Sequence, residues 1–256
     1  MRINDLKVLD LFSGIGGFTL GLERAGGFKT VAFSEIEPYP SAVLATHWPA
    51  VRNLGDIRLI KSSQVGPVDV ICGGFPCQNI SQAGAAHGQQ TGIEGEKSGL
   101  WSEYRRLIDE LRPQWAVIEN VSALRSQGLA SLLQDLAEVG YDAQWDCIPA
   151  SAVGSIQNRD RVWIIAYPSG QRVPRLLTYE HLSAARQRRT CGPEDLPRVY
   201  SDPFRSGSWP QPLLRRDHGW VPNWVDRIKA LGNSVDPKIP QLYGEAIRRY
   251  RDAYST

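Results

Sequence analysis

The stretch LKVLDLFSGIGGFTLGLERAG (residues 6–26) decides the fold. It begins with a short apolar run at 6–11, passes through a glycine-rich turn, and continues at 18–26 with apolar residues at helical spacing before a glycine stop. A strand followed by a tight turn and a helix is the first unit of an α/β fold. Glycines in this turn would let the backbone lie close to a ligand. The third position of a GxGxxG pattern is Thr19, so an ordinary tight turn is the alternative.

The same alternation continues along the first two-thirds of the chain. Further strands are predicted at 29–35, 53–58 (a short strand or its end), 68–74, 114–120, 141–150 and 161–167. Helices are predicted at 40–48, 100–113, 129–140, 223–234 and 239–254. Strands that alternate with helices predict a mostly parallel sheet with helices on both faces.

The character of the sequence changes between residues 168 and 222. This stretch holds 8 of the 17 prolines, and residues 162–222 hold nine arginines, no lysine and five acidic residues. We therefore expect a catalytic domain at 1–167, a small irregular Arg/Pro-rich region at 168–222, and a C-terminal segment at 223–256 that packs back on the first domain. A basic segment in a chain of net charge +2 is a candidate surface for phosphate contacts, and a solvated irregular face is the alternative.

Composition places the chain among ordinary soluble proteins, with 42% hydrophobic and 22% charged residues. No apolar run approaches the roughly 20 residues that span a bilayer, and the N-terminus does not read as a signal peptide, so we expect a cytoplasmic protein without membrane contact. The four cysteines are Cys72, Cys77, Cys147 and Cys191, and their spacing does not match a zinc site. We therefore expect free thiols and no metal.

Acidic residues follow two of the predicted strands. In open parallel sheets, ligands bind beyond the carboxyl ends of the strands. Glu35 lies about 20 residues beyond the glycine turn, where an acid can accept hydrogen bonds from ribose hydroxyls. Asp56 could accept one from an exocyclic amino group such as that of adenine. Each could also be an isolated surface acid.

The stretch GGFPCQNIS (73–81) places a cysteine in a loop after an apolar strand. Pro76 stiffens the backbone before Cys77, and a thiolate on such a loop is a candidate nucleophile, although most buried cysteines only fill space. The following residues, 81–99, contain five glycines and are predicted to form a lid.

Further polar candidates lie at the end of the predicted strand 114–120 and around the start of the predicted strand 161–167. Glu119 ends an apolar strand, so burial could raise its pKa and let it act as an acid. Gln157, Arg159 and Arg161 lie around the start of the last strand of this region. Alternation puts both arginines on one face, available for a phosphate or a carbonyl oxygen.

Taken in order, these elements resemble those of the cytosine-5 DNA methyltransferases. The shared elements are DLFSGIGGF (10–18), the acid in FSEIE (33–37), GDI (55–57), GGFPCQNIS (73–81), ENV (119–121), QNRDR (157–161) and LGNSV (231–235). The resemblance covers residues 6–167 and about 223–250. The gap of about 70 residues between the arginine motif and the last element is short for this family, and PNWVDRIKALGNS (222–234) resembles the compact ending of some phage and prophage members.

The resemblance implies a Rossmann-like, S-adenosylmethionine-dependent methyltransferase fold with a small irregular target-recognition subdomain. The implied cofactor-binding residues are Phe12, Gly14, Ile15, Gly17, Glu35, Ile36, Asp56, Ile57, Pro76, Leu100, Asn233 and Val235. Because the last two lie far along the chain, the C-terminal helix must fold back beside the first strand.

The resemblance also implies a reaction on a cytosine that is flipped out of the duplex. Cys77 would add to ring carbon 6, and Glu119 would donate to ring nitrogen 3. Arg161 would hold the carbonyl oxygen at carbon 2, and Arg159 a nearby phosphate or the active-site loop. Carbon 5 would take the methyl group and lose its proton as Cys77 leaves. The implied DNA-contacting residues are Phe75, Gln78, Ser81, Asn120 and Gln157.

The implied partner is double-stranded DNA, with a cognate restriction endonuclease as a possible second partner and a monomer as the expected state. Three alternatives stay open. One is an RNA-directed relative that methylates tRNA cytosine, and another is a catalytically inactive DNA-binding relative, against which the intact Cys77, Glu119 and Arg161 argue. The third is a nucleotide-dependent oxidoreductase on a similar sheet, against which the glycine spacing argues.

Overall fold

The computed structural model describes residues 5–76, 99–155, 159–187, 229–230 and 232–254. Seven strands form one sheet in the order β3-β2-β1-β4-β5-β7-β6. Their bounds are β1 (Leu6–Leu11), β2 (Phe28–Ser34), β3 (Arg52–Asn53), β4 (Val70–Gly74), β5 (Trp115–Val121), β6 (Tyr141–Pro149) and β7 (Asp160–Pro168). The strand order reverses between β1 and β4, which is the switch point where open α/β sheets bind ligands.

One strand of the sheet runs against the others. The pairs β1–β2, β2–β3, β1–β4 and β4–β5 are parallel, whereas β7 is antiparallel to both β5 and β6. In this register Val121, the last residue of β5, pairs with Arg161 near the beginning of β7. The reversed strand therefore begins at the same edge of the sheet where the parallel strands end.

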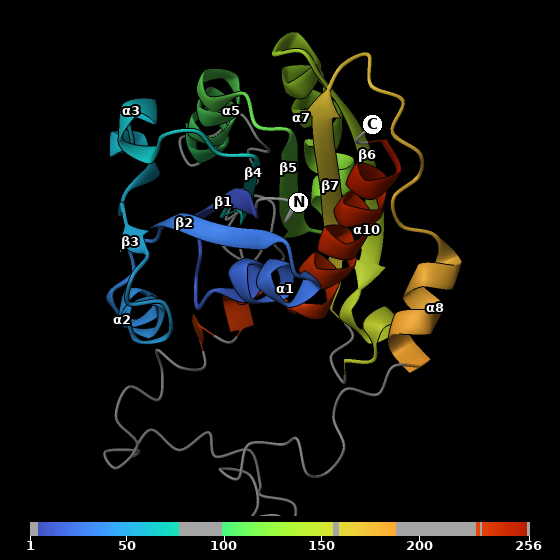
Figure 1. Cartoon of the computed structure of the whole chain (residues 1–256), viewed down its shortest axis with the longest axis horizontal. Helices are drawn as coiled ribbons and strands as arrows, with labels where there is room; N and C mark the ends of the chain where they lie inside the picture. Colours follow the sequence, from blue (N-terminus) through green and yellow to red (C-terminus); the bar gives the residue numbers. More distant parts are fainter. Residues whose placement is uncertain (1–4, 77–98, 156–158, 188–228, 231, 255–256) are drawn as a thin grey trace, which may run out of the picture.

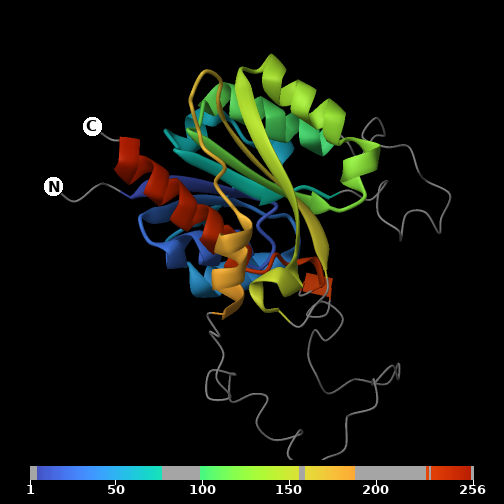
Figure 2. The same cartoon turned by 90° about the vertical axis from the view of Figure 1, so that its right-hand side faces the viewer.

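Helices cover both faces of the sheet. They are α1 (Gly17–Ala25), α2 (Pro38–His47), α3 (Ser62–Val65), α5 (Gly99–Leu111), α6 (Leu124–Gln127), α7 (Leu129–Glu138), α8 (Tyr179–Gln187) and α10 (Lys238–Tyr254), with short 3₁₀ turns η1 (Ile57–Leu59) and η4 (Ala150–Val153). Figures 1 and 2 show α1 and α10 side by side on one face and α5 and α7 on the other. The predicted α/β class, with a mostly parallel sheet covered on both faces, is confirmed.

Each face has its own hydrophobic core. The amphipathic helix α5 buries one stripe, Trp101, Tyr104, Leu107 and Ile108, against the sheet. The opposite core joins α1 and α10 to β1 and β4 through side chains such as Leu22. Both cores are continuous along the sheet, so the strand ends that carry polar residues are held on a rigid support.

Small residues let the C-terminal part of the chain lie directly against α1. A Cβ built on Gly17 would lie 2.6 Å from the carbonyl oxygen of Val235, and one on Gly21 would meet the backbone at Pro237. On α10, a Cβ on Gly244 would lie 2.7 Å from that of Ala25. Helix α10 and the residues before it therefore lie directly against α1, the helix that follows the first strand.

Residues 169–187 pack on the sheet that precedes them. The side chain of Gln144 on β6 donates to the carbonyl oxygens of Val173 (3.2 Å) and Pro174 (3.0 Å), and Leu176 and Leu177 are buried in the core that also contains α1 and α10. Helix α8 follows, so the prediction of an irregular region is wrong for Tyr179–Gln187. The helix has no buried residue, and its sequence therefore carries no apolar stripe that would have indicated it. Residues 188–222 lie outside the described residues, so the domain boundary at 168 stays a prediction.

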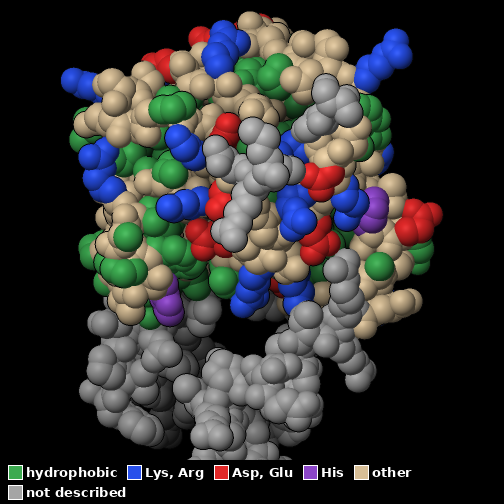
Figure 3. Space-filling model, viewed as in Figure 1, with side chains coloured by type: hydrophobic (Ala, Val, Ile, Leu, Met, Phe, Trp, Pro, Cys, Tyr) green, Lys and Arg blue, Asp and Glu red, His purple; other side chains and the backbone are tan. Residues whose placement is uncertain are grey.

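Acidic and basic side chains are interspersed on the face of the molecule that Figure 3 shows. Six of the nine arginines in the basic segment, those from residue 188 onward, lie outside the described ranges. The predicted phosphate-contacting surface thus stays a prediction. Among the described helices, none is both long and apolar enough to cross a membrane.

We predict that Gly21→Ala lowers the free energy of unfolding by about 1–3 kcal/mol, because the added methyl group would overlap the backbone at Pro237 and the Cβ of Pro240, 2.8 Å away. Helix propensity alone would act in the opposite direction, since alanine favours a helix interior over glycine. Urea denaturation measures the change. The matched control is Gly99→Ala on α5, where a Cβ has nothing within 4 Å; an equal loss there would contradict the packing explanation.

Candidate active site

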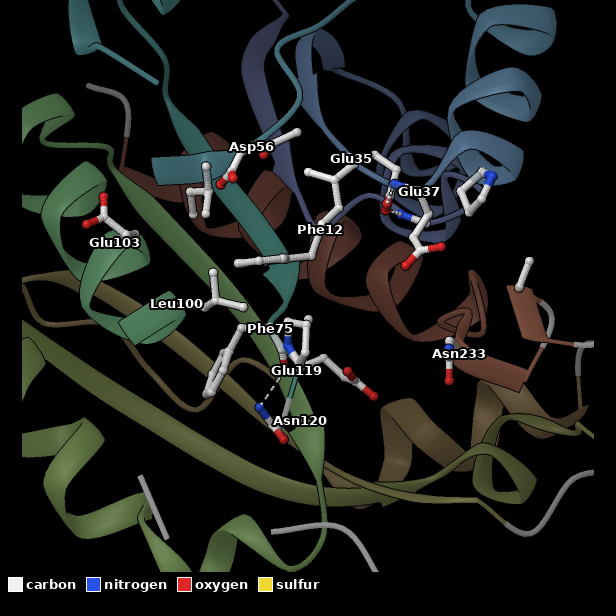
Figure 4. A pocket seen from close by; sticks show the side chains of 18 of the residues that line it. Phe12, Glu35, Glu37, Asp56, Phe75, Leu100, Glu103, Glu119, Asn120 and Asn233 are labelled. Atoms are coloured by element: carbon white, nitrogen blue, oxygen red, sulfur yellow. Dashed lines mark hydrogen bonds between the residues drawn. The ribbon is translucent and has the colours of Figure 1, made fainter. Parts of the chain in front are cut away.

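A cavity of about 770 Å³ opens at the edge of the sheet where β1, β2, β4 and β5 end (Figure 4). The predicted site residues that line it are Phe12, Gly14, Glu35, Ile36, Asp56, Ile57, Phe75, Pro76, Leu100, Glu119, Asn120, Arg159, Arg161 and Asn233. Three predicted cofactor residues, Ile15, Gly17 and Val235, do not line it, and Gly17 lies instead against the backbone of Val235. Cys77, Gln78, Ser81 and Gln157 lie outside the described residues. Their roles stay predictions.

Glu35 is held at one end of the cavity by backbone donors. One carboxylate oxygen accepts a hydrogen bond from the Gly14 N–H (2.8 Å) and the other from the Glu37 N–H (2.8 Å). A carboxylate has about four acceptor positions, so Glu35 keeps acceptor capacity on each oxygen. The side chain is therefore fixed in orientation and can still accept bonds from a pair of hydroxyls.

Asn53, at the end of β3, joins the two predicted acidic positions. Its side-chain oxygen accepts from the N–H groups of Glu35 (3.0 Å) and Gly55 (3.1 Å), and its amide donates to the Glu35 carbonyl (2.9 Å) and to Ser41 Oγ (3.1 Å). Sequence analysis missed this residue, because an asparagine at the end of a short strand has no distinctive spacing. It positions the loops that carry Glu35 and Asp56.

Asp56 begins the 3₁₀ turn η1 and pairs with Arg58. The Arg58 side chain donates to both Asp56 carboxylate oxygens, and the Arg58 N–H donates to Oδ1 (3.0 Å). These hydrogen bonds from Arg58 lower the pKa of the Asp56 carboxyl below its usual range. Asp56 is thus an anion and an acceptor over the whole neutral range.

The cavity wall between Glu35 and Asp56 consists of glycine backbone and apolar side chains. Gly14 (φ +53°) and Gly55 (φ +74°) have left-handed backbone conformations, and a Cβ on either would meet nothing within 4 Å. Phe12 takes a left-handed φ of 51° despite its side chain, and its ring stacks on that of Tyr104. Figure 4 shows Phe12 in the middle of the site, between Asp56 and Glu119.

At the other end of the cavity, Glu119 forms a buried ion pair with Arg161. The Arg161 Nε lies 2.8 Å from Glu119 Oε1, and the Glu119 side chain is 10% exposed. Burial raises the pKa of the Glu119 carboxyl, and the charges of Arg161 and Arg159 oppose that rise. Glu119 is therefore easier to protonate than an ordinary surface glutamate.

Gly74 provides the space for the second oxygen of this carboxylate. It pairs with Glu119 across β4 and β5, and a Cβ built on Gly74 would lie 2.6 Å from Glu119 Oε2. With Oε1 on Arg161 and Oε2 over Gly74, the carboxyl group has little freedom to rotate. Gly74 also lines the cavity, and sequence analysis did not assign it a role.

Arg159 connects the catalytic end to the C-terminal segment. Its Nη1 donates to the carbonyl oxygen of Ser234 (2.6 Å), and within the described part of the chain its buried Nε has no hydrogen-bond partner. Burial lowers the pKa of this guanidinium, with a smaller effect from Arg161. Arg159 therefore lies where the sheet edge and the predicted LGNSV element meet.

Asn120 fixes the segment that leads to Cys77. Its amide donates to the carbonyl oxygen of Phe75 (3.1 Å), and its side-chain oxygen accepts from the Val121 N–H (2.8 Å). Asn120 is buried, and so is Phe75. The end of β5 thus fixes the backbone at Phe75, two residues before the predicted nucleophile Cys77.

Several residues of the cavity wall were not predicted. These are Ser34, Glu37, Tyr39, Pro40, Gly55, Arg58, Gly74, Gly99, Ser102, Glu103, Val121, Lys229 and Ala230. Most are direct neighbours of predicted residues, so the positions of strand ends could have suggested them. Lys229 could not be found in this way: it reaches across from the C-terminal segment to Glu37, 3.2 Å away.

The buried residue Asp10 holds the glycine-rich turn against α1 through hydrogen bonds. Its Oδ2 accepts from the hydroxyl (2.7 Å) and the N–H (3.2 Å) of Thr19, and its carbonyl oxygen accepts from Ser13 Oγ (2.6 Å). Burial raises the pKa of Asp10 to about 7, against the opposing hydrogen bonds from Thr19 and Cys72. Asp10 therefore links β1, the turn and α1.

We predict that Asp10 makes stability depend on pH and that Asp10→Asn removes this dependence. At pH values between the unfolded pKa of 3.8 and the folded pKa of about 7, the Asp10 carboxyl is ionised in the unfolded state and still protonated in the folded state. The contribution of Asp10 is therefore complete at about pH 4 and is lost as pH rises through about 7. Relative to Asp10→Asn, the wild type should lose on the order of 3 kcal/mol between pH 4 and pH 8. Urea denaturation at both pH values measures this, and parallel curves for the two proteins would contradict it.

Comparisons with known proteins agree with this arrangement. The solved structure of a proposed DNA modification methyltransferase encoded within a prophage of E. coli matches with a TM-score of 0.56 and 26% identity, over 69% of this chain and 50% of that one. A DNMT2 variant from Spodoptera frugiperda matches with a TM-score of 0.56 and 22% identity over 66% of this chain and 52% of that one, which shows the fold alone. The predicted Rossmann-like methyltransferase fold is thereby confirmed.

Curated relatives are similar to slightly less than two-thirds of the chain. Type II methyltransferase M2.BsuMI from Bacillus subtilis is 37% identical over 63% of this chain, and M.Sau3AI from Staphylococcus aureus is 34% identical over 64% of it. The chain spans less than half the length of either relative, 42% and 44%. The family model for C-5 cytosine-specific DNA methylase matches residues 6–197. With three-quarters of its length in that match, this chain belongs to the C-5 cytosine-specific DNA methylases.

Proposed function

We propose that this protein methylates carbon 5 of cytosine in double-stranded DNA, with S-adenosylmethionine as the methyl donor. One observation carries the proposal: Glu35 and Asp56 line the same cavity as Glu119 and Arg161. Two carboxylates that can accept hydrogen bonds from a nucleoside thus line the same cavity as an acid and a cation that can bind a pyrimidine ring. Membership of the family supports the choice of cytosine in DNA as substrate.

The wall between the acids fits S-adenosylmethionine. Ile36 is 66% exposed at the cavity, so it offers an apolar surface to the face of a planar ring. Gly14 and Gly55 leave open space beside bare backbone. We propose that Glu35 accepts from the ribose hydroxyls and Asp56 from the adenine amino group. The cofactor, when bound, would supply the methyl group that carbon 5 of cytosine receives.

The protein's own groups would prepare the cytosine. We propose that the Cys77 thiolate forms a bond to carbon 6, which moves an electron pair of the ring toward carbon 5. Glu119 would donate to ring nitrogen 3 and offset the charge that develops there. After methylation, a base such as a water molecule would take the carbon 5 proton. The C–H electron pair would re-form the double bond between carbons 5 and 6, Cys77 would leave as a thiolate, and nitrogen 3 would return its proton to Glu119. Cys77 enters this scheme through the resemblance of GGFPCQNIS to the family.

The environment of Glu119 supports its role as a donor. Its pKa is raised by burial, so a larger fraction carries the proton near neutral pH than for an exposed glutamate. Arg161 occupies Oε1, which leaves Oε2 to face a substrate. The same guanidinium is a suitable donor to the carbonyl oxygen at carbon 2, and Arg159 to a phosphate or the active-site loop.

The flipped-out base requires a duplex that can be opened locally. The proposal therefore includes DNA contacts by Phe75, Gln78, Ser81, Asn120 and Gln157. It further includes a monomer that acts in the cytoplasm, and a cognate restriction endonuclease as a second partner.

The first test is methyl transfer from labelled S-adenosylmethionine to plasmid DNA, with wild type beside Cys77→Ala. We expect incorporation by the wild type alone, and methylation-sensitive sequencing should locate the label on cytosine carbon 5. A parallel reaction with tRNA separates the two substrates. Label in tRNA and not in DNA, or equal incorporation by Cys77→Ala, would contradict the proposal.

We also predict that Gly74→Ala lowers kcat by about 10- to 100-fold, because the added methyl group displaces the Glu119 carboxyl from its place opposite Arg161. The affinity for S-adenosylmethionine should change less than twofold, since Glu35 and Asp56 are untouched. Steady-state kinetics and calorimetric titration measure the two quantities. The comparison variant is Glu119→Gln, which keeps the shape and removes the acid; a fully active Gly74→Ala would show that the carboxyl position is not critical.

A further inference from the structure

The turn η1, which carries the predicted adenine contacts, is too short to be stable on its own. It spans only Ile57–Leu59 and follows Asp56, and a single 3₁₀ turn has little intrinsic stability. Its own bonds are few: the Leu59 N–H donates to the Asp56 carbonyl (3.0 Å) and the Ile60 N–H to the Ile57 carbonyl (3.2 Å). Contacts from another element must therefore set its position.

Those contacts come from Arg106 on α5. Its Nη2 donates to the carbonyl oxygens of Ile57 (3.3 Å), the first residue of η1, and Ile60 (3.0 Å), the residue that follows η1. Its Nε donates to Glu103 (2.7 Å) and its Nη1 to Glu110 (2.9 Å), three residues before and four residues after it on the same helix. All three nitrogens of the guanidinium are thus engaged, and two acids keep the group aimed at η1.

The guanidinium joins two walls of the cavity without lining it. Asp56, Ile57 and Arg58 form one wall at this end, and Leu100, Ser102 and Glu103 of α5 form the facing one. Figure 4 shows Asp56 and Leu100 on separate elements that face the same space. Glu103 belongs to the α5 wall and is itself bonded to Arg106. Arg106 thus links the two walls of the adenine end directly, in addition to the burial of Ile57 and Ile60 in the core.

We propose that Arg106 is a positioning residue for the cofactor site: by holding η1 to α5 it places Asp56 and Ile57 at the distance that the adenine ring requires. This assignment rests on the proposed use of S-adenosylmethionine. It predicts a specific effect on the cofactor, because Glu119 and Arg161 are positioned by β5 and β7 and not by η1.

The neighbouring residue offers a matched control. Arg105 lies on the same helix, is 34% exposed at its side chain against 32% for Arg106, and also pairs with two acids, Asp135 and Glu138. Those acids belong to α7 and its end, on the side away from η1. Substitution of either arginine removes two ion pairs made by α5. Only substitution of Arg106 also removes the hydrogen bonds to the carbonyls of Ile57 and Ile60.

The test is calorimetric titration with S-adenosylmethionine and steady-state kinetics for wild type, Arg106→Met, Arg106→Lys and Arg105→Met. We expect Arg106→Met to weaken cofactor affinity and raise the cofactor KM by about tenfold, while kcat at saturating cofactor changes less than twofold. Arg106→Lys should be intermediate, because one ammonium group cannot reach both carbonyls and both carboxylates. Arg105→Met should bind as the wild type does, with a similar decrease in melting temperature.

Two results would overturn the inference. One is cofactor binding by Arg106→Met equal to that of the wild type, and the other is an equal loss of affinity in Arg105→Met. If Arg106→Met does not fold, the intermediate affinity of Arg106→Lys decides in its place. A wild type that binds no S-adenosylmethionine would overturn the proposed cofactor along with this inference, so failure of the function is visible before any variant is measured.

Discussion

The ion pair between Glu119 and Arg161 depends on the one reversed strand of the sheet. In a wholly parallel sheet, the beginning of β7 would lie at the opposite edge from the end of β5. Because β7 is antiparallel, Arg161 enters the sheet opposite Val121, where its guanidinium reaches the carboxyl of Glu119. Burial of an ionised carboxyl is costly unless the group is well paired, and the partly exposed Arg161 provides that partner. The reversal of β7 therefore makes it possible for the apolar end of β5 to carry an ionisable group.

A second constraint is the close contact between α1 and the returning C-terminal segment. Glycines on α1 and α10 remove the side chains that would separate them, so residues near Val235 can reach the edge of β1. From there the segment supplies Asn233 to the cavity, a carbonyl to Arg159 and a cation to Glu37. The cavity thus has walls from both ends of the chain. The complete cavity therefore requires α10 to pack against α1, although α10 lies away from the proposed catalytic residues.

The sequence predicted most strands of the sheet because their signals are local, whereas the predicted strand 53–58 ends in the 3₁₀ turn η1 (Ile57–Leu59). Apolar runs such as 6–11 and 68–74 lie within two residues of β1 and β4, and the acids that follow strands do line the cavity. Strand direction was not predictable, since an apolar run such as 161–167 reads alike in a parallel or antiparallel strand. Asn53, Gly74 and Arg106 were missed for a related reason. Their importance lies in contacts between elements distant in sequence, which spacing does not encode.

The carboxyls of this site differ in environment, and the difference matches what each can do. Hydrogen bonds from Arg58 lower the pKa of Asp56, so this side chain accepts and does not donate. Burial raises the pKa of Glu119, against two arginines, so this side chain can hold and release a proton. Asp10 is also buried but faces hydroxyl and thiol groups, which suits a neutral structural role. The opposite shifts of these two pKa values support the proposed roles of Asp56 as a hydrogen-bond acceptor and Glu119 as an acid. The chain achieves this by placing one at an exposed turn and the other at the end of an apolar strand.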